Sequence, residues 1–272
     1  MDDNHKLMYD TGMEGNSLKK QSDGEQRHSP EEPRLSERYA AFLEKVKGKL
    51  SPEETEEFSA LNEEEKGKES REDMSATDYL TGLRNRRGFY EEVQRLDALL
   101  AREQQYTRMK IPSAFLYIDL DGFKEVNDSC GHACGDRGLK LVAENVRAAV
   151  REYDVLARIG GDEFGVFTHG NDEEAAVQFA GRIRAAIEGV TEKLRAEYPG
   201  YKGHLSASIG VIGLDEAKGF LGEKFTPEEA MRLADFALYA AKAAGKEGTL
   251  SYTEAAKLDS DGTFKKDFLA SA

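Results

Sequence analysis

The sequence is poor in the residues that stabilise small secreted folds. Its 272 residues include no tryptophan, six prolines and only two cysteines, Cys130 and Cys134. Two cysteines make no disulfide framework, and a structural zinc site usually needs four ligands in recognised spacings. We therefore expect two free thiols, as in a reducing cytosol. We reject a zinc site in the run Cys-Gly-His-Ala-Cys, in which we expect His132 to be structural.

Long apolar runs and basic charge are also lacking. No stretch approaches the roughly 20 apolar residues that span a bilayer, and the polar start of the chain lacks the apolar core of a signal peptide. The chain has 38 Lys and Arg and 52 Asp and Glu, which gives a net charge of −14. Binding to a nucleic-acid polymer requires basic surface. These absences predict a cytoplasmic protein with no membrane insertion and no nucleic-acid polymer as partner.

Residues 1–73 form an acidic N-terminal region with 20 acidic and 12 basic residues. This composition predicts partial disorder. Apolar residues recur at helical spacing from Leu35 to Leu50, and Ser-Pro-Glu-Glu at 51–54 is typical of a capped helix start. We expect a helical hairpin or a dimerising segment over residues 35–68. The remainder divides into a folded domain, 74–252, and a tail, 253–272.

The most informative feature is the pentapeptide at 160–164, which is Gly-Gly-Asp-Glu-Phe. It lies between two short β-type runs, 155–159 and 164–168, so it predicts a hairpin with a charged tip. Glycine tolerates positive φ and leaves room for a ligand to approach the backbone. Paired acids at such a tip suit a divalent cation. Taken alone, the pentapeptide also fits an ordinary Gly-Gly-Asp turn with solvated carboxylates.

Hydrophobic periodicity around the hairpin gives an ordered series of elements. Strands are predicted at 113–119, 155–159, 164–168 and 205–211. Helices are predicted at 135–152 and 176–187, with residues 120–122 as a turn. The order is βαββαβ, the split βαβ arrangement of ferredoxin-like α+β folds.

This topology predicts which residues meet. In a split βαβ unit the third strand lies between the first and the second, antiparallel to both, so its hairpin tip lies beside the end of strand one. Asp119 would therefore lie next to Asp162 and Glu163. Such acids repel one another unless a cation neutralises them, although a purely structural acid cluster is the alternative. Hard oxygen ligands select magnesium or manganese, and two metals would suit phosphoryl displacement.

Several further motifs follow in order, and together they resemble a GGDEF domain, the catalytic domain of diguanylate cyclases, over residues 74–252. The motifs are Asp78 to Arg87, Asp119 to Asp128, Gly131-His132 with Gly135-Asp136, Ser208 to Gly210, and Ala234 to Lys242. The resemblance implies a nucleotidyl-cyclase-like core with an extra C-terminal helix and strand. It also implies that a homodimer condenses two GTP into cyclic di-GMP and two pyrophosphates.

The resemblance assigns roles residue by residue. Two Mg²⁺ or Mn²⁺ ions per active site would be held by Asp119, the Leu120 carbonyl, Asp162 and Glu163. Glu163 and Asp162 are the candidates for catalysis, and which acid does what stays open. Asn127 and Asp136 would read the guanine edge. The GTP-binding set is Gly122, Phe123, Lys124, Asn127, Asp136, Gly160, Gly161, Lys242 and Lys246.

Two features qualify this assignment. Lys246 stands where the family usually has arginine, so the grip on phosphate should be weaker. Arg151 and Asp154 form an Arg-x-x-Asp that resembles the family's inhibitory site for cyclic di-GMP, and a charge pair at a helix C-terminus is the alternative. A catalytically silent cyclic di-GMP receptor, or an interaction protein that uses its acidic N-terminal region, would be the competing functions.

Overall fold

The structure, a computed structural model, describes residues 76–107, 110–245 and 247–259. The expected N-terminal region 1–73, with its helical hairpin over 35–68, lies outside the described residues. Lys246 and the last part of the tail, from residue 260, lie outside them as well.

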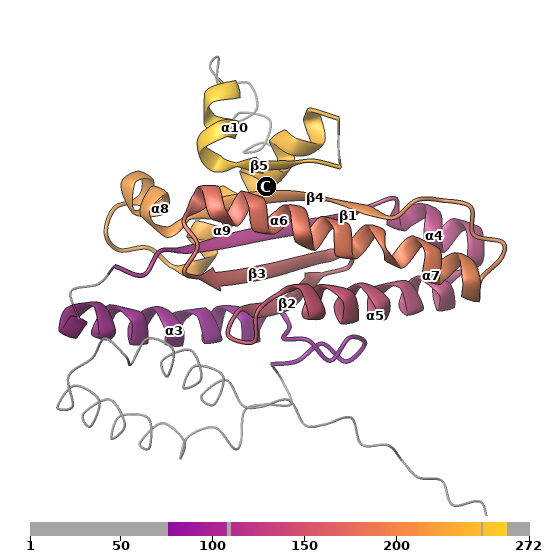
Figure 1. The fold of residues 1–272 in the computed structure, drawn as a ribbon, viewed down its shortest axis with the longest axis horizontal. Helices are drawn as coiled ribbons and strands as arrows, with labels where there is room; N and C mark the ends of the chain where they lie inside the picture. The colour runs from indigo at the N-terminus through magenta and orange to yellow at the C-terminus, as the bar shows by residue number, and fades with distance from the viewer. Residues whose placement is uncertain (1–75, 108–109, 246, 260–272) are drawn as a thin grey trace, which may run out of the picture. The chain divides into compact units, whose positions relative to one another are not determined.

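A five-stranded sheet forms the centre of the fold, with the strand order β2-β3-β1-β4-β5 (Figure 1). Its strands are β1 (Ser113–Asp121), β2 (Val155–Gly160), β3 (Glu163–His169), β4 (Ser206–Gly213) and β5 (Thr249–Ser251). Strand β3 lies between β1 and β2 and is antiparallel to both, whereas β5 pairs in parallel with β4. The predicted ferredoxin-like α+β core is therefore confirmed, including the extra C-terminal strand.

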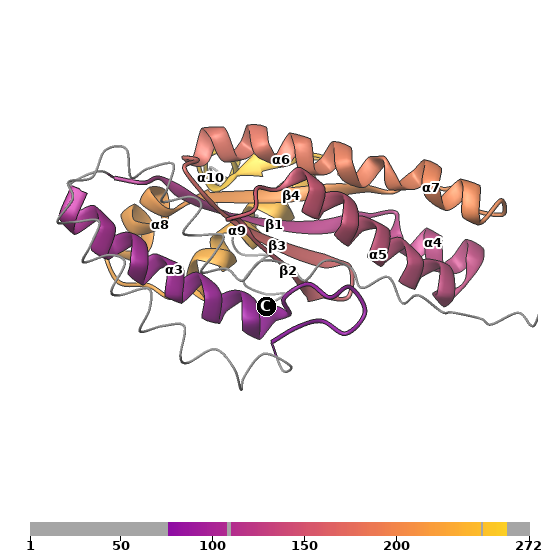
Figure 2. The same ribbon diagram turned by 60° about the horizontal axis from the view of Figure 1, so that its bottom comes forward.

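Helices cover both faces of the sheet (Figures 1 and 2). One face packs against α5 (His132–Ala149), α6 (Glu173–Glu188) and α7 (Val190–Glu197). The other packs against α3 (Arg86–Thr107), α8 (Leu214–Leu221) and α9 (Pro227–Ala243). Strand β1 is buried on both sides, because Leu116 and Ile118 face the first layer while Phe115 and Tyr117 face the second.

The structure differs from the predicted elements at the end of β1. Leu120 and Asp121 belong to the strand, and the turn falls on Gly122, with a φ of 84°. A Cβ at Gly122 would collide with the carbonyl oxygen of His204, so the position requires glycine. Helix α4 (Phe123–Cys130) begins directly afterwards. The sequence pattern did not predict this helix, because Val126 is its only buried residue and the helix therefore has no apolar stripe.

The folded part continues past residue 252, which we predicted as its end. Helix α10 (Tyr252–Leu258) begins with a capping box, in which Ser251 and Glu254 exchange side-chain and backbone hydrogen bonds. Buried Ala255 packs with Phe236 of α9. Among the described residues, no helix is long and apolar enough to cross a membrane.

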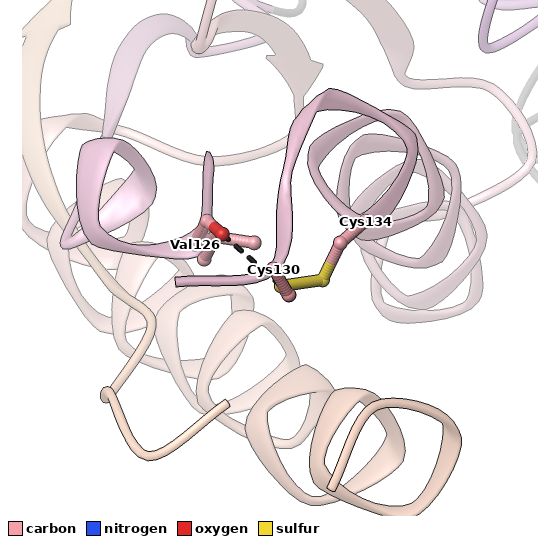
Figure 3. Close-up of a disulfide and its surroundings, with 3 residues drawn as sticks. All are labelled: Val126, Cys130 and Cys134. Carbon is pink, nitrogen blue, oxygen red and sulfur yellow. Dashed lines mark hydrogen bonds between the residues drawn. A yellow bond between two sulfur atoms is a disulfide. The ribbon is translucent and has the colours of Figure 1, made fainter. Parts of the chain in front are cut away.

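The two cysteines are paired. Cys130 ends α4, Cys134 lies in the first turn of α5, and their sulfurs form a disulfide (Figure 3). The expectation of two free thiols is wrong for this structure. The helix break at Gly131, with a φ of 82°, brings the two Cα atoms to 5.6 Å, a separation that suits a disulfide.

Candidate active site

The acids meet where the topology predicted. Asp119 of β1 is the register partner of Glu163, the first residue of β3, and the Leu120 N–H donates to the carbonyl oxygen of Asp162 at 3.2 Å. Because opposite residues on antiparallel strands project to the same face, the side chains of Asp119 and Glu163 share one end of the sheet. The hairpin tip thus lies beside the end of the apolar part of β1.

One of these acids is already neutralised. The Nζ atom of Lys242, on α9, lies 2.7 Å from Oδ1 of Asp119. Burial raises the pKa of Asp119, Lys242 lowers it, and the charges of Asp162 and Asp121 raise it again, so the pKa stays above its ordinary value. The cation that already offsets part of the repulsion among the three expected acids is therefore the Lys242 ammonium, which pairs with Asp119.

Two further groups belong to this site and were missed in the sequence. Asp235 of α9 has a pKa raised to about 6, first by burial and then by the charge of Glu163. Tyr117 of β1 has a raised pKa, first through burial and then through the charge of Glu163. Spacing could have revealed both. Asp235 lies two helical turns before Lys242, and Tyr117 lies two strand residues before Asp119.

Asp121, the last residue of β1, is a buried acid whose carboxylate is used for hydrogen bonds within the fold. It is buried, and its Oδ2 accepts a 2.6 Å hydrogen bond from the Ser208 hydroxyl and a 3.1 Å bond from the Glu247 N–H. The carboxylate therefore joins β1 to β4 and to the segment after α9. This contact gives a structural role to Ser208, which the sequence motif alone did not.

The donors at the hairpin fit a divalent cation. Asp119, Asp162 and Glu163 offer carboxylate oxygens, the ligands that Mg²⁺ and Mn²⁺ prefer. Burial, and after it the charge of neighbouring carboxylates, raises the pKa values of Asp119 and Asp235, and a cation would offset the repulsion between the carboxylates. Within residues 76–259, as far as the structure describes them, no three acidic, His or Cys side chains already converge as a metal cluster. The donor chemistry fits a cation, but a closed cage is not built in advance.

Gly160 and Gly161, at the hairpin tip, differ in the space that a side chain would have. Neither Gly160 nor Gly161 has positive φ, so neither uses the freedom in φ that glycine allows. A Cβ on Gly160 would lie 2.7 Å from Oε2 of Glu163, and it would displace the acid. A Cβ on Gly161 would meet nothing within 4 Å, so this glycine leaves open space at the tip.

Arg158 fixes the tip from the preceding strand. Its Nε and Nη2 donate to the carbonyl oxygen of Gly161 at 3.0 and 2.8 Å, and its Nη1 lies 3.1 Å from Oδ2 of Asp78. The Asp78 carboxylate also accepts from the backbone and hydroxyl of Thr81. The opening motif is thus tied to the hairpin, a contact between distant segments that no local pattern reveals.

The expected nucleotide-binding residues lie on α4 and α5. Lys124 and Asp136 are exposed, and Asn127 is half-buried. A Cβ on Gly135 would collide with Oδ1 of Asn127, so the Asn127 amide rests directly on the first turns of α5. Phe123 packs partly against the core. Lys246 lies outside the described residues.

Comparison with known proteins decides the family. A sequence profile described as "Diguanylate cyclase, GGDEF domain" matches residues 75–248. This chain belongs to the GGDEF family.

Relatives of this GGDEF domain agree with the match. Probable diguanylate cyclase DgcT of Escherichia coli strain K12 is 34% identical over 177 residues, which cover 64% of this chain and 35% of that protein. Response regulator PleD of Caulobacter vibrioides strain NA1000 / CB15N is 35% identical over 178 residues, which cover 65% and 36%. The chain therefore spans about a third of the length of these curated relatives.

A solved structure shows the same fold. The GGDEF domain of DgcB from Caulobacter crescentus, in complex with c-di-GMP, aligns with a TM-score of 0.55 and 25% identity. The alignment covers 68% of this chain and 99% of that one.

In this GGDEF domain the Arg-x-x-Asp lies at the other end of β2 from the hairpin tip. Asp154 is only 1% exposed, and its Oδ2 accepts from the Arg151 N–H at 2.8 Å. The Arg151 Nη1 donates to the carbonyl oxygen of His169 at 3.2 Å. Burial raises the pKa of Asp154, while the Arg151 backbone lowers it. The pair stabilises the turn into β2, so Arg151 is the more accessible of the two for a ligand.

Proposed function

We propose that this chain is a diguanylate cyclase that condenses two GTP into cyclic di-GMP and releases two pyrophosphates. The observation that carries the proposal is the intact Gly-Gly-Asp-Glu-Phe tip, with Glu163 in register with Asp119 and with a lysine on α9 within reach. GTP as substrate fits a cytoplasmic location.

The residues around the tip would divide the work of binding. Lys124 and the backbone amides of Gly122 and Phe123, at the start of α4, would meet the β- and γ-phosphates. Asn127 and Asp136 would read guanine, because a carboxylate accepts from the N1–H and the exocyclic amine that adenine does not present together. Lys242 and Lys246 would add positive charge from the end of α9 and the segment after it.

The acids would hold metal and handle the proton. Two Mg²⁺ or Mn²⁺ ions, held by Asp119, the Leu120 carbonyl, Asp162 and Glu163, would supply positive charge to the phosphoryl oxygens. Glu163 or Asp162 would accept the proton of the attacking 3′-hydroxyl. Lys242 would leave Asp119 for a phosphate oxygen when nucleotide arrives.

The reaction needs two copies of the chain. Each domain would bind one GTP, and each 3′-hydroxyl would attack the α-phosphate held by the partner, so catalysis requires at least a transient homodimer. Cyclic di-GMP bound at Arg151 and Asp154 would inhibit without competing with GTP, because that pair lies at the opposite end of β2.

The test is direct. Purified full-length protein is incubated with GTP and Mg²⁺, and the product is identified by mass. A Glu163→Gln variant and ATP in place of GTP serve as controls. We expect cyclic di-GMP from the wild type with GTP alone. Binding of cyclic di-GMP without synthesis would instead indicate a silent receptor, and neither property would indicate an interaction protein.

A further inference from the structure

Both cysteines of the chain lie in the segment that we propose binds guanine. Cys130 is the last residue of α4, three residues after Asn127, and Cys134 is two residues before Asp136 on α5. Their disulfide closes a small ring across Gly131, His132 and Ala133 (Figure 3). The bond therefore joins the two helices that bear the proposed guanine-reading side chains.

The disulfide lies beside a close contact between α4 and α5. The Asn127 amide rests on Gly135, the neighbour of Cys134, so closely that no side chain fits between them. The Gly131 N–H donates to the Asn127 carbonyl at 2.8 Å, and the Cys134 N–H donates to the Gly131 carbonyl at 3.0 Å. A covalent link from α4 to α5 restricts how far this junction, and with it Asn127, can move relative to Asp136.

The reduced form can also fold. Cys134 is fully buried in the core with Val126 and Leu139, and those contacts do not need the bond. The Cys130 sulfur lies 3.1 Å from the carbonyl oxygen of Val126 (Figure 3). A Cys130 thiol could donate a weak hydrogen bond to that oxygen, whereas a disulfide sulfur has no hydrogen to donate. Both redox states are therefore compatible with the same helices.

The two sulfurs differ in their exposure to solvent and therefore in their expected roles in thiol exchange. Cys130 is half-buried and Cys134 is fully buried, so an external reagent reaches Cys130 first. Cys134 lies in the first turn of an 18-residue helix and is shielded by the core, so its partner in exchange is the Cys130 sulfur beside it.

We propose that Cys130 and Cys134 form a reversible thiol–disulfide exchange site that tunes nucleotide affinity. The coupling to GTP rests on the proposed function. In oxidation, the Cys130 thiolate attacks a low-molecular-weight disulfide and releases one thiol. The Cys134 thiolate then attacks the Cys130 sulfur and releases the second, so two electrons pass from the protein to the reagent and two protons leave the cysteines. A dithiol reverses both steps.

The oxidised form should bind nucleotide more tightly. Ordering a mobile side chain on binding weakens affinity, and a link that orders Asn127 beforehand removes part of that loss. We expect the affinity of the oxidised protein to exceed that of the reduced protein by about two- to tenfold.

The test measures redox state and affinity separately. Full-length protein is equilibrated with oxidised glutathione or with a dithiol, and free thiols are counted by alkylation and mass. Calorimetry then follows binding of the α,β-methylene analogue of GTP with Mg²⁺, which cannot be condensed. Cys130→Ser and Cys134→Ala are measured alongside, with a thermal melt to verify folding. We expect the wild type to change between no free thiol and two, and Cys130→Ser to bind like the reduced wild type in every buffer. Cys134→Ala should bind like the reduced wild type in the dithiol, and oxidised glutathione should trap it as a mixed disulfide at Cys130, visible by mass.

The outcomes separate the two proposals. Equal analogue affinity in the oxidised and reduced wild type, or a wild type that keeps two free thiols under oxidant, would overturn the redox site while leaving the proposed function standing. The same redox response in Cys130→Ser as in the wild type would also overturn it. Absence of analogue binding in both states, with the disulfide formed by mass, would overturn the GTP site itself and the coupling with it.

Discussion

The ammonium of Lys242 lies 2.7 Å from Oδ1 of Asp119, so α9 neutralises the carboxylate at the end of β1. Both side chains are partly shielded from water, with 33% and 17% of their surfaces exposed. An ion pair of this kind is stronger than one at the open surface and weaker than one in the core. The phosphates of a bound nucleotide would compete with Asp119 for the same ammonium, so the pair defines the resting state of the site.

Replacing this lysine should weaken catalysis more than stability. In Lys242→Met the half-buried Asp119 loses its partner and its pKa rises further, which we expect to lower the free energy of unfolding by about 1–2 kcal/mol. Loss of a cation that meets phosphate should lower kcat/KM by about tenfold or more. Urea unfolding and a product assay measure the two effects. Lys224→Met, an exposed lysine before α9, is the matched control and should change neither. Wild-type kcat/KM in Lys242→Met would remove this residue from phosphate binding.

Glu163→Gln should abolish product formation and leave the fold intact. The substitution keeps the shape of the side chain and removes a charge that metal and proton transfer require. It should not destabilise the protein, because one of several mutually repelling acids disappears. Because the charge of Glu163 helps to raise the pKa of Asp235 to about 6, that pKa should fall in the variant. Carboxyl NMR titration of labelled Asp235 measures the fall. An unchanged Asp235 pKa would mean that the two carboxylates do not interact as described.

The hairpin tip should depend on the fork geometry of Arg158. Arg158→Lys keeps the charge beside Asp78 but cannot donate twice to Gly161 and also reach the carboxylate. We expect a loss of about 1–3 kcal/mol in stability and faster amide exchange at Asp162 and Glu163. Asp78→Asn, which removes only the ion pair, should disturb the tip less. If the amides of Asp162 and Glu163 exchange at the wild-type rate in both variants, Arg158 does not stabilise the tip and the two strands alone hold it.

The sequence predicted the parts of the fold and site that depend on repeating patterns. Strand β1 and helix α6 show clear periodicity, and the βαββαβ order alone placed Asp119 beside Glu163. Helix α4 was not predicted, since it has a single buried residue. The resemblance implied the extra C-terminal strand, but its three residues, β5, gave no pattern from which to place its bounds. The Lys242–Asp119 pair joins remote segments, and such contacts appear only after the chain has folded.

The disulfide was missed for a related reason. We expected free thiols because the chain has only two cysteines. Whether the two pair depends instead on the break between α4 and α5 at Gly131, which brings them together. Arg158 was missed because a single charged residue in an apolar strand gives no periodic signal, although its contacts with Gly161 and Asp78 fix the tip.

Buried His169 should make stability fall in mild acid. Burial lowers its pKa to about 4, against 6.5 in the unfolded chain, so the unfolded state binds a proton that the folded state does not. The folded protein should lose stability as pH falls from about 6.5 to about 4, by about 3 kcal/mol in all. Urea unfolding at several pH values, in wild type and His169→Gln, isolates this contribution because other buried acids are common to both. Exposed His204→Gln is the control. Parallel pH profiles for wild type and His169→Gln would show that His169 titrates normally.

Arg151→Ala should abolish product inhibition while sparing the initial rate. Asp154 is almost fully buried and caps the turn, so Arg151 is the side of the pair that a guanine-bearing anion can reach. Removing its charged fork should weaken binding of cyclic di-GMP by at least about tenfold. Initial rates should stay within about twofold, because Arg151 lies at the far end of β2 from the catalytic tip.

Calorimetric titration with cyclic di-GMP in the absence of GTP, together with progress curves, measures the affinity and the rates. Glu152→Ala, the exposed neighbour, should bind and turn over like the wild type. Equal affinity in wild type and Arg151→Ala would mean that Arg151, through its bond to the His169 carbonyl, serves only the turn before β2.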